Sequence, residues 1–230
     1  MTGRAFDGYY TDQKSKLLGD FSKFSEKYAR RVLVSHYGKD LADTILKETR
    51  HEYEELIPKL PYVGGKKNPL TKSLVQSAWA LALFRALKVH GETAEETGKM
   101  VYDMVEMQLR SYPKLLRYLV GRWYFTRYNY NKMKRQASDS QKRLYPEDWV
   151  WSFIRGDGKE FDWGMDNTEC GVCKFFHAQD ANELTPYLCK LDFGMSQALG
   201  MGLVRTMTIA EGDEKCDFRY KRGRETPTQT

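Results

Sequence analysis

The chain has 230 residues, of which 41% are hydrophobic and 30% charged, and its 37 basic and 31 acidic residues give a net charge of +6. A chain of this length and composition can bury a core without disulfides or metal ions. A disordered tail and a small disulfide-rich scaffold are therefore excluded, and the four cysteines are expected to stay reduced.

The N-terminal half of the chain has the periodicity of helices. Apolar residues recur every three or four positions over residues 17–32 and again over residues 39–56. A loop rich in Pro and Gly follows, and the pair Asn68-Pro69 is typical of a helix start. The next predicted helix, residues 70–90, is apolar nearly all round and is expected at the centre of the core. It is too short and too polar to span a bilayer.

Two further helices are predicted before the pattern changes. Thr93 and Glu96 have the spacing of a capping box, which predicts a helix that runs to about residue 110. Residues 113–134 have the pattern of another helix. Residues 136–146 are polar and are predicted to form a loop.

The remaining sequence has the pattern of short strands. Residues 149–154 alternate, and a Gly-Asp-Gly turn separates them from residues 161–165, which predicts a hairpin. A helix is predicted over residues 184–199, and a second hairpin from residues 203–210 and 215–220.

These elements predict an α+β fold, in which a helical N-terminal part packs on a C-terminal antiparallel sheet with one or two helices. We expect a single domain over residues 1–230, with the helical part at about 10–135, the α+β part at about 147–222 and a polar tail at 223–230. The start of the chain has no apolar segment typical of a secretory signal, so we expect a cytoplasmic protein.

The positive charge is concentrated in one segment. Residues 110–143 contain ten basic residues and one acid, Asp139, so this segment carries +9 and the remainder of the chain −3. Interleaved aromatic rings are also found in proteins that bind single-stranded nucleic acid. A solvated basic helix face is the plainer interpretation, and a basic wall that attracts a small anionic substrate is a third. We favour a local role of this kind over a nucleic-acid surface.

Four residues that can ligate zinc form the pattern C-x2-C-x3-H-x11-C, with Cys170, Cys173, His177 and Cys189. Three thiolates and an imidazole are a suitable zinc set, although structural sites usually have two compact ligand pairs. A redox C-x-x-C motif is a second interpretation, but the strand-to-helix context of thioredoxin-like motifs is not evident in the sequence. Two further interpretations are that these cysteines are buried structural thiols or catalytic thiols.

Carboxylates adjoin two of the cysteines. Asp192 lies three residues after Cys189, so both would project from one face of a helix. Asp217 adjoins Cys216 on a predicted strand, so their side chains point to opposite faces. The sequence has no phosphate-binding glycine loop, no G-x-S-x-G and no H-E-x-x-H. Nucleotide-dependent, serine-hydrolase and zincin chemistry are therefore disfavoured.

Three ordered segments carry a family resemblance that runs from about residue 28 to residue 220. They are LPYVGGKKNPLTKSLVQSAWALALFRALKVHGETAEE; FDWGMDNTEC with NELTPYLCKLDF; and RTMTIAEGDEKCDFRY. Together they resemble the L-2-amino-thiazoline-4-carboxylic acid hydrolase family. Five residues match Cys and Asp positions of the family: Cys170, Cys189, Asp192, Cys216 and Asp217. Cys173 lies outside the shared pattern, and His177 has no known role in it.

The resemblance implies hydrolytic opening of a cyclic C–N/C–S compound that carries a carboxylate. In the type reaction, water adds to the carbon between nitrogen and sulfur, and the sulfur leaves as a thiol to give N-carbamoyl-cysteine. This chemistry needs a base, an acid and a cationic group for the substrate carboxylate. The five matching residues are therefore the candidate catalytic residues. The substrate-binding candidates are Arg205, His177 and Asn68, and Arg122 or Arg127 is the alternative to Arg205.

We thus expect a cytoplasmic enzyme with a small-molecule partner and with neither a nucleic acid nor a membrane as partner. The sequence requires no cofactor, and we assign no residue as a metal ligand, although a divalent metal ion stays open. Two alternatives also stay open: a ring-forming or isomerising biosynthetic enzyme on the same scaffold, and a non-catalytic module that binds a small molecule or zinc.

Overall fold

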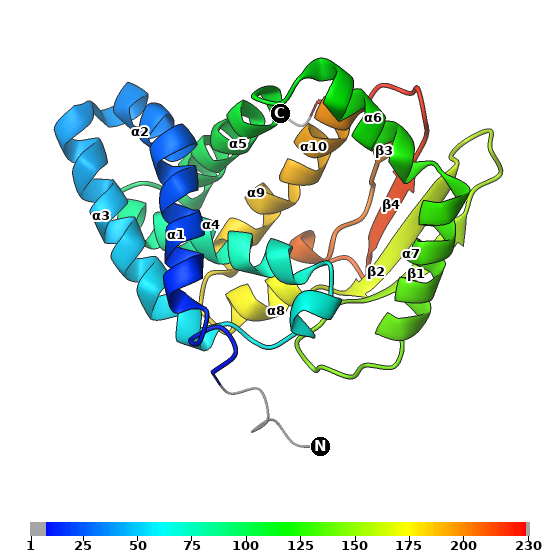
Figure 1. Ribbon diagram of the computed structural model, residues 1–230, viewed down its shortest axis with the longest axis horizontal. Coiled ribbons are helices and arrows are strands. Elements are labelled where there is room, and N and C mark those ends of the chain that lie inside the picture. Colours follow the sequence, from blue (N-terminus) through cyan, green and yellow to red (C-terminus); the bar gives the residue numbers. More distant parts are fainter. Residues whose placement is uncertain (1–7, 229–230) are drawn as a thin grey trace. The chain divides into compact units, whose positions relative to one another are not determined.

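The computed structural model describes residues 8–228 and has the α+β fold that the sequence predicts, with a helical N-terminal half and a C-terminal four-stranded antiparallel sheet (Figure 1). It divides into two compact units: the first comprises Met1–Val105 and Lys174–Leu188, and the second Glu106–Cys173 and Cys189–Thr230. The expectation of one domain stays a prediction. Within residues 8–228, every helix is too short or too polar to cross a membrane.

The first unit is built from long helices. Its elements are α1 (Lys14–Phe24), a π-helical turn (Ser25–Ala29), α2 (Arg30–Tyr37), α3 (Lys39–Leu56) and α4 (Thr71–Val89), followed by α5 (Ala94–Arg110), which continues into the second unit. α3 packs along α4. Leu74, Leu81 and Leu87 on α4 are fully buried, which confirms the expectation that this helix lies in the core.

Of the two helix starts predicted in this half, the one at Thr93 forms with its side-chain cap, whereas α4 begins at Thr71 without one and Asn68 bonds the backbone before it. The Asn68 side chain accepts a hydrogen bond from the Leu70 N–H (2.9 Å) just before α4. The Thr93 hydroxyl oxygen accepts one from the Glu96 N–H (3.1 Å), which is the first of the two bonds of a capping box, and the Thr93 hydroxyl donates to the Glu96 carboxylate.

The second unit begins with two helices where the sequence predicted one. They are α6 (Lys114–Tyr124) and α7 (Arg127–Ser140), so the predicted continuous helix over residues 113–134 is wrong. The chain is extended at Thr126, whose hydroxyl oxygen accepts a hydrogen bond from the Asn129 N–H and caps the new helix. α7 also runs into the segment predicted as a loop.

The sheet has the strand order β1-β2-β4-β3, and all its neighbouring strands are antiparallel. The strands are β1 (Val150–Arg155), β2 (Trp163–Glu169), β3 (Leu203–Val204) and β4 (Cys216–Tyr220). The first predicted hairpin, β1–β2, is confirmed. The second predicted hairpin is shorter than expected because β3 has only two residues. Beyond it, the backbone N–H groups of Thr206 and Met207 bond the side chain of Asp217 on β4 instead of a neighbouring strand.

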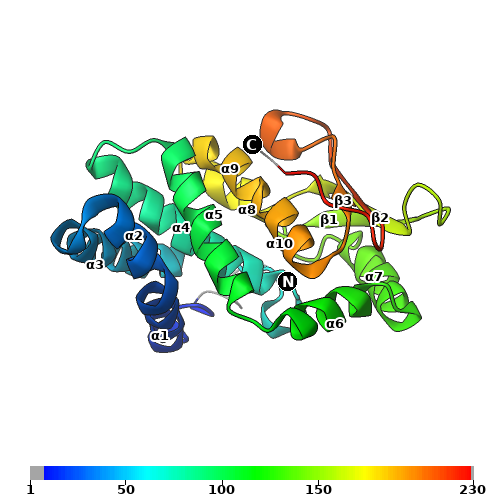
Figure 2. The same ribbon diagram turned by 90° about the horizontal axis from the view of Figure 1, so that it is seen from above.

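Aromatic side chains form the core of this unit. Trp163 on β2 stacks on Tyr220 of β4 with a centroid distance of 4.3 Å. Phe218 and Phe193, the latter from α10 (Leu191–Leu199), complete the same buried cluster. Two short helices, α8 (Gly171–His177) and α9 (Thr185–Cys189), precede α10, and Lys190 separates α9 from α10 within the segment that was predicted as one helix (Figure 2).

Candidate active site

Cys170 occupies the junction between a strand and a helix. β2 ends at Glu169 and α8 begins at Gly171, so Cys170 immediately precedes the helix and Cys173 lies in its first turn. The strand-to-helix context that the sequence did not reveal is therefore present. Backbone N–H groups at such a helix start are free to bond an anion because they have no partner within the helix.

The Cys170 thiol is arranged to ionise. The Cys173 thiol donates a hydrogen bond to Cys170 and, with the backbone N–H groups of Cys173 and Val172, lowers the pKa of Cys170 to about 7. Burial opposes this shift but does not cancel it. The hydrogen bond that the Cys173 thiol donates to Cys170 raises the pKa of Cys173 far above its usual value, and burial acts in the same direction. Cys170 is thus the thiolate of the pair, and Cys173 the proton donor.

Cys189 and Asp192 lie on either side of the junction between α9 and α10. Burial, and secondarily the charge of Asp192, raises the pKa of the Cys189 thiol to about 12. Cys189 is therefore protonated at neutral pH. Burial also raises the pKa of Asp192, although the guanidinium of Arg205 acts in the opposite direction. A carboxylate with a raised pKa accepts a proton more readily than one in water.

Arg205 holds this junction together. Its Nη1 donates to Oδ2 of Asp192 at 2.8 Å, and its Nη2 donates to the Cys189 carbonyl at 3.1 Å. The guanidinium lies 5.0 Å from the ring centroid of Phe193 and 5.2 Å from that of Phe218. The side chain of Arg205 is 6% exposed and that of Asp192 is 42% exposed. The arginine is thus buried, while the carboxylate that it orients stays accessible.

Cys216 and Asp217 on β4 have different surroundings, as their alternation predicts. Cys216 is buried, and its sulfur accepts a hydrogen bond from the Ile209 N–H at 3.3 Å. Asp217 accepts three hydrogen bonds of 2.7 Å, from the N–H and hydroxyl of Thr206 and the N–H of Met207. Burial alone would raise the pKa of Asp217, but these bonds hold it below its usual value. Asp217 therefore stays ionised and shapes the segment after β3.

The four thiols share one neighbourhood within the second unit. The charges of Cys170, Cys189 and Cys216 each act to raise the pKa of Cys173. The Asp192 carboxylate in turn acts to raise the pKa of Cys170, against the larger effects that lower it. Electrostatic effects of this kind require proximity, so the structure brings together four of the five predicted catalytic residues, Cys170, Cys189, Asp192 and Cys216, with Arg205 and Cys173. Asp217 lies on the other face of β4, and its placement with this cluster stays a prediction.

The other two predicted residues have local partners. His177, the last residue of α8, is exposed, and its Nδ1 lies 3.1 Å from the Asn182 amide nitrogen. The Asn68 amide donates to the Val63 carbonyl at 2.5 Å and also caps the approach to α4. Their assignment to substrate binding stays a prediction.

The described residues offer no ready-made metal centre. Within residues 8–228, no three His, Cys, Asp or Glu side chains are arranged to hold a metal ion. The zinc set Cys170, Cys173, His177 and Cys189 is therefore not assembled in this structure.

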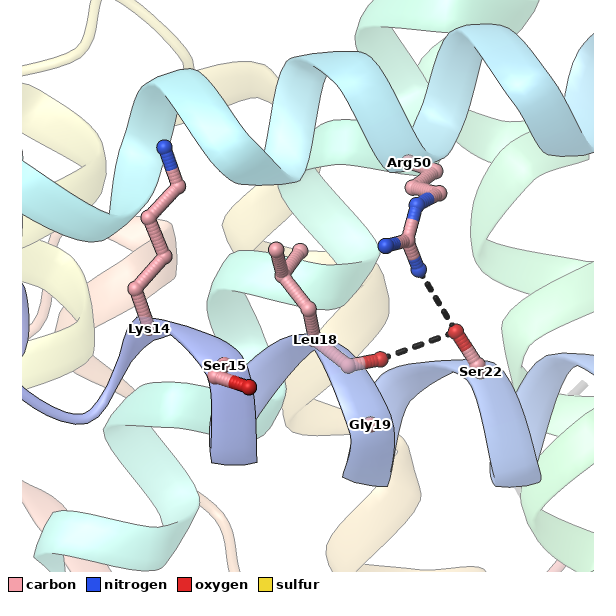
Figure 3. A pocket seen from close by; sticks show the side chains of 6 residues that line it. All are labelled: Lys14, Ser15, Leu18, Gly19, Ser22 and Arg50. Atoms are coloured by element: carbon pink, nitrogen blue, oxygen red, sulfur yellow. Dashed lines mark hydrogen bonds between the residues drawn. The ribbon is translucent and has the colours of Figure 1, made fainter.

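A surface depression lies elsewhere, between α1 and α3 (Figure 3). It has a volume of about 540 Å³ and is lined by Lys14, Ser15, Leu18, Gly19, Ser22 and Arg50. Arg50 donates to the Ser22 hydroxyl at 2.7 Å, and this hydroxyl donates to the Leu18 carbonyl at 2.9 Å. None of the candidate catalytic residues lines this depression, and Lys14 at its edge is paired with Glu54 at 2.7 Å.

Sequence reasoning underestimated Cys173. It treated this residue as outside the shared pattern, whereas the structure makes it the hydrogen-bond donor that favours the Cys170 thiolate. The C-x-x-C spacing after a strand was the available signal, since it places the second thiol one helical turn from the first.

Comparison with known proteins identifies a family for the chain. A family model described as L-2-amino-thiazoline-4-carboxylic acid hydrolase matches residues 72–220, which include every residue of the thiol cluster. Neither the curated proteins nor the solved structures contain a significant match.

Proposed function

The chain belongs to the L-2-amino-thiazoline-4-carboxylic acid hydrolase family, and from this premise we propose that it opens a small cyclic substrate by hydrolysis. The proposed substrate carries a carboxylate and a ring carbon bonded to both nitrogen and sulfur. One observation carries the assignment of residues: the Cys170 thiol, with a pKa of about 7, lies near the accessible carboxylate of Asp192.

In the first half of the proposed reaction, Cys170 is the nucleophile. Its thiolate attacks the ring carbon between nitrogen and sulfur, and the bond from this carbon to the ring sulfur breaks. The electron pair of that bond leaves with the ring sulfur. The carbon is then held to the enzyme as an S-linked isothiourea. Cys189, which is protonated because burial raises its pKa to about 12, is suited to donate a hydrogen bond to the departing sulfur.

In the second half, water releases the product. Asp192 accepts a proton as water adds to the same carbon, and the Cys170 thiolate leaves when the carbon–oxygen double bond forms. That proton passes to the departed ring sulfur, and the second proton of the water goes to the nitrogen that was doubly bonded to the carbon. One water molecule is consumed, the product carries a carbamoyl group and a thiol, and the enzyme returns to its starting state.

Arg205 supports this chemistry chiefly by position. Two of its nitrogen atoms are engaged with Asp192 and with the Cys189 carbonyl, so it fixes the carboxylate relative to the second thiol. Its charge also favours an anionic substrate nearby. We therefore assign Arg205 to orienting Asp192 and attracting the substrate carboxylate.

Turnover of aminothiazoline carboxylate, and of ring analogues that differ in the carboxylate, tests the proposal. Cys170→Ala and Asp192→Asn should each lower kcat/KM by at least ~10²-fold, the usual loss for a nucleophile or a general base. Lys14→Ala in the surface depression is a matched control that should leave the rate unchanged. Wild-type turnover by Cys170→Ala would remove this thiol from the mechanism, and no turnover of any such ring by the wild type would reject the substrate class.

A further inference from the structure

α6 turns its apolar face away from the second unit, to which it belongs. Large apolar side chains on α6 and just before it are exposed by 39–68%: Tyr112, Leu115, Leu116, Leu119, Val120 and Trp123. At 3.6 residues per turn, the five of these that lie on α6, from Leu115 to Trp123, fall within an arc of roughly 140° on one side of the helix. An ordinary surface helix buries such an arc, so α6 has the inverse orientation.

The opposite side of α6 anchors it to the second unit. Gly121 packs so closely against α10 that a Cβ atom there would lie 1.8 Å from the Leu199 carbonyl oxygen. Arg117 donates to the Ala198 carbonyl at 3.5 Å. Because a glycine without a side chain makes the close approach, rotating the helix to bury its leucines would break this contact. The outward orientation is therefore built into the packing.

Positive charge borders the exposed face, with Arg122 and Lys132 beside it and Lys114 on the opposite side of α6. The segment of residues 110–143 carries +9, and Lys114, Arg122 and Arg127 form no ion pair with a described residue. Arg122 lies over the Tyr118 ring at 5.7 Å, and Lys132 lies over the Trp123 ring at 5.4 Å. These cations lie at the edge of the apolar face, so they would contact any surface to which that face binds.

We propose that α6 binds an anionic lipid surface, with its apolar side chains at the boundary between headgroups and acyl chains and the flanking Arg and Lys side chains on lipid phosphates. Leucine, tryptophan and tyrosine on one face with basic residues beside it are the features of helices that lie in a membrane interface. This departs from the sequence-based expectation of no membrane partner, which rested on the lack of a spanning segment. The proposal is independent of the proposed hydrolase function.

Charge distinguishes this occupant from the two obvious others. A second copy of the chain would bring an equally positive segment against the first, which disfavours pairing through this face. Nucleic acid is anionic, but the leucine and valine side chains at the centre of the face offer no surface on which bases stack. An anionic lipid surface satisfies both the charge and the apolar character.

Vesicle sedimentation of the full chain tests the proposal. The wild type should bind phosphatidylcholine vesicles that contain phosphatidylglycerol at least roughly tenfold more tightly than pure phosphatidylcholine vesicles, and salt should weaken the binding. The double variant Leu115→Gln/Leu119→Gln should lose at least roughly tenfold in affinity. Leu144→Gln, at an exposed leucine outside α6, is the matched control and should bind as the wild type does.

Three results would overturn the proposal. They are equal binding to both kinds of vesicle, unchanged binding by the α6 double variant, and a wild-type dimer in light scattering that the double variant converts to a monomer. The last would assign the face to a second copy. Circular dichroism and thermal unfolding of the double variant establish that a loss of binding reflects the surface and not the fold.

Discussion

Arg205 is hydrogen-bonded to Asp192 at 2.8 Å, and its guanidinium is packed against the rings of Phe193 and Phe218. The cation is buried and the anion is accessible. Arg205 therefore fixes where the carboxylate lies without occupying the side that a substrate or water would approach. Its second bond, to the Cys189 carbonyl, ties α9 to the same point.

Removing this cation should destabilise the protein as well as the site. Arg205→Met is expected to lower the free energy of unfolding by about 2 kcal/mol, since breaking a buried ion pair leaves a charge without its partner. The figure is discounted because the Asp192 side chain is 42% exposed and water screens it. Urea denaturation measures the change. Arg50→Met, at a surface arginine bonded to Ser22, is the control, and equal losses in the two variants would contradict this role.

The low pKa of Cys170 should appear directly in its reactivity. The rate of alkylation by iodoacetamide, followed by peptide mass spectrometry, should rise with pH with a midpoint near 7 at Cys170. Cys189, whose pKa is about 12, should stay unreactive over the same range. A Cys170 midpoint near the ordinary thiol value of 9.0 would contradict the hydrogen-bond arrangement at the start of α8.

Cys173 should act through Cys170. Cys173→Ala removes the thiol donor, so the pKa of Cys170 should rise and turnover at pH 7 should fall roughly tenfold for each unit of the shift. Raising the pH should restore the rate, because the thiolate then forms without help. Cys173→Ser keeps a donor and should retain most of the activity. A loss in Cys173→Ala that does not recover at high pH would indicate a structural role instead.

Asp217 should contribute to stability in a pH-dependent way. Its folded-state pKa lies below the unfolded value of 3.8, so its contribution is present above that value and is lost as the pH falls through the folded-state pKa. Asp217→Asn should therefore cost about 1 kcal/mol at pH 7 and little in strong acid. Thermal unfolding of both proteins at several pH values measures this difference. A penalty that is independent of pH would contradict it.

Much of the fold follows from local patterns, whereas the site depends on contacts between distant segments. The capping box at Thr93 and the apolar pattern of α4 are local, and the structure confirms both. The break at Thr126 was missed because the apolar periodicity continues through it. β3 is shorter than its alternating sequence predicts, because Asp217 bonds the backbone that would otherwise extend the strand.

The site was only partly predictable, because it depends on contacts between segments that are distant in the sequence. The spacing of Cys189 and Asp192 indicated a shared face, but nothing local showed that Arg205 would bind both segments. The outward face of α6 was also hidden, since periodicity reveals that a helix has an apolar side but not which way that side turns. Packing against Leu199, far along the chain, decides it.

Intact-mass spectrometry of Asp192→Asn with aminothiazoline carboxylate tests the central claim most directly. This variant should attack the ring but release the product slowly, so a covalent adduct of one substrate mass should accumulate and map to Cys170. The double variant Cys170→Ala/Asp192→Asn should form no adduct. Wild-type turnover by Cys170→Ala, with no adduct in either variant, would contradict the role of Cys170 as the nucleophile.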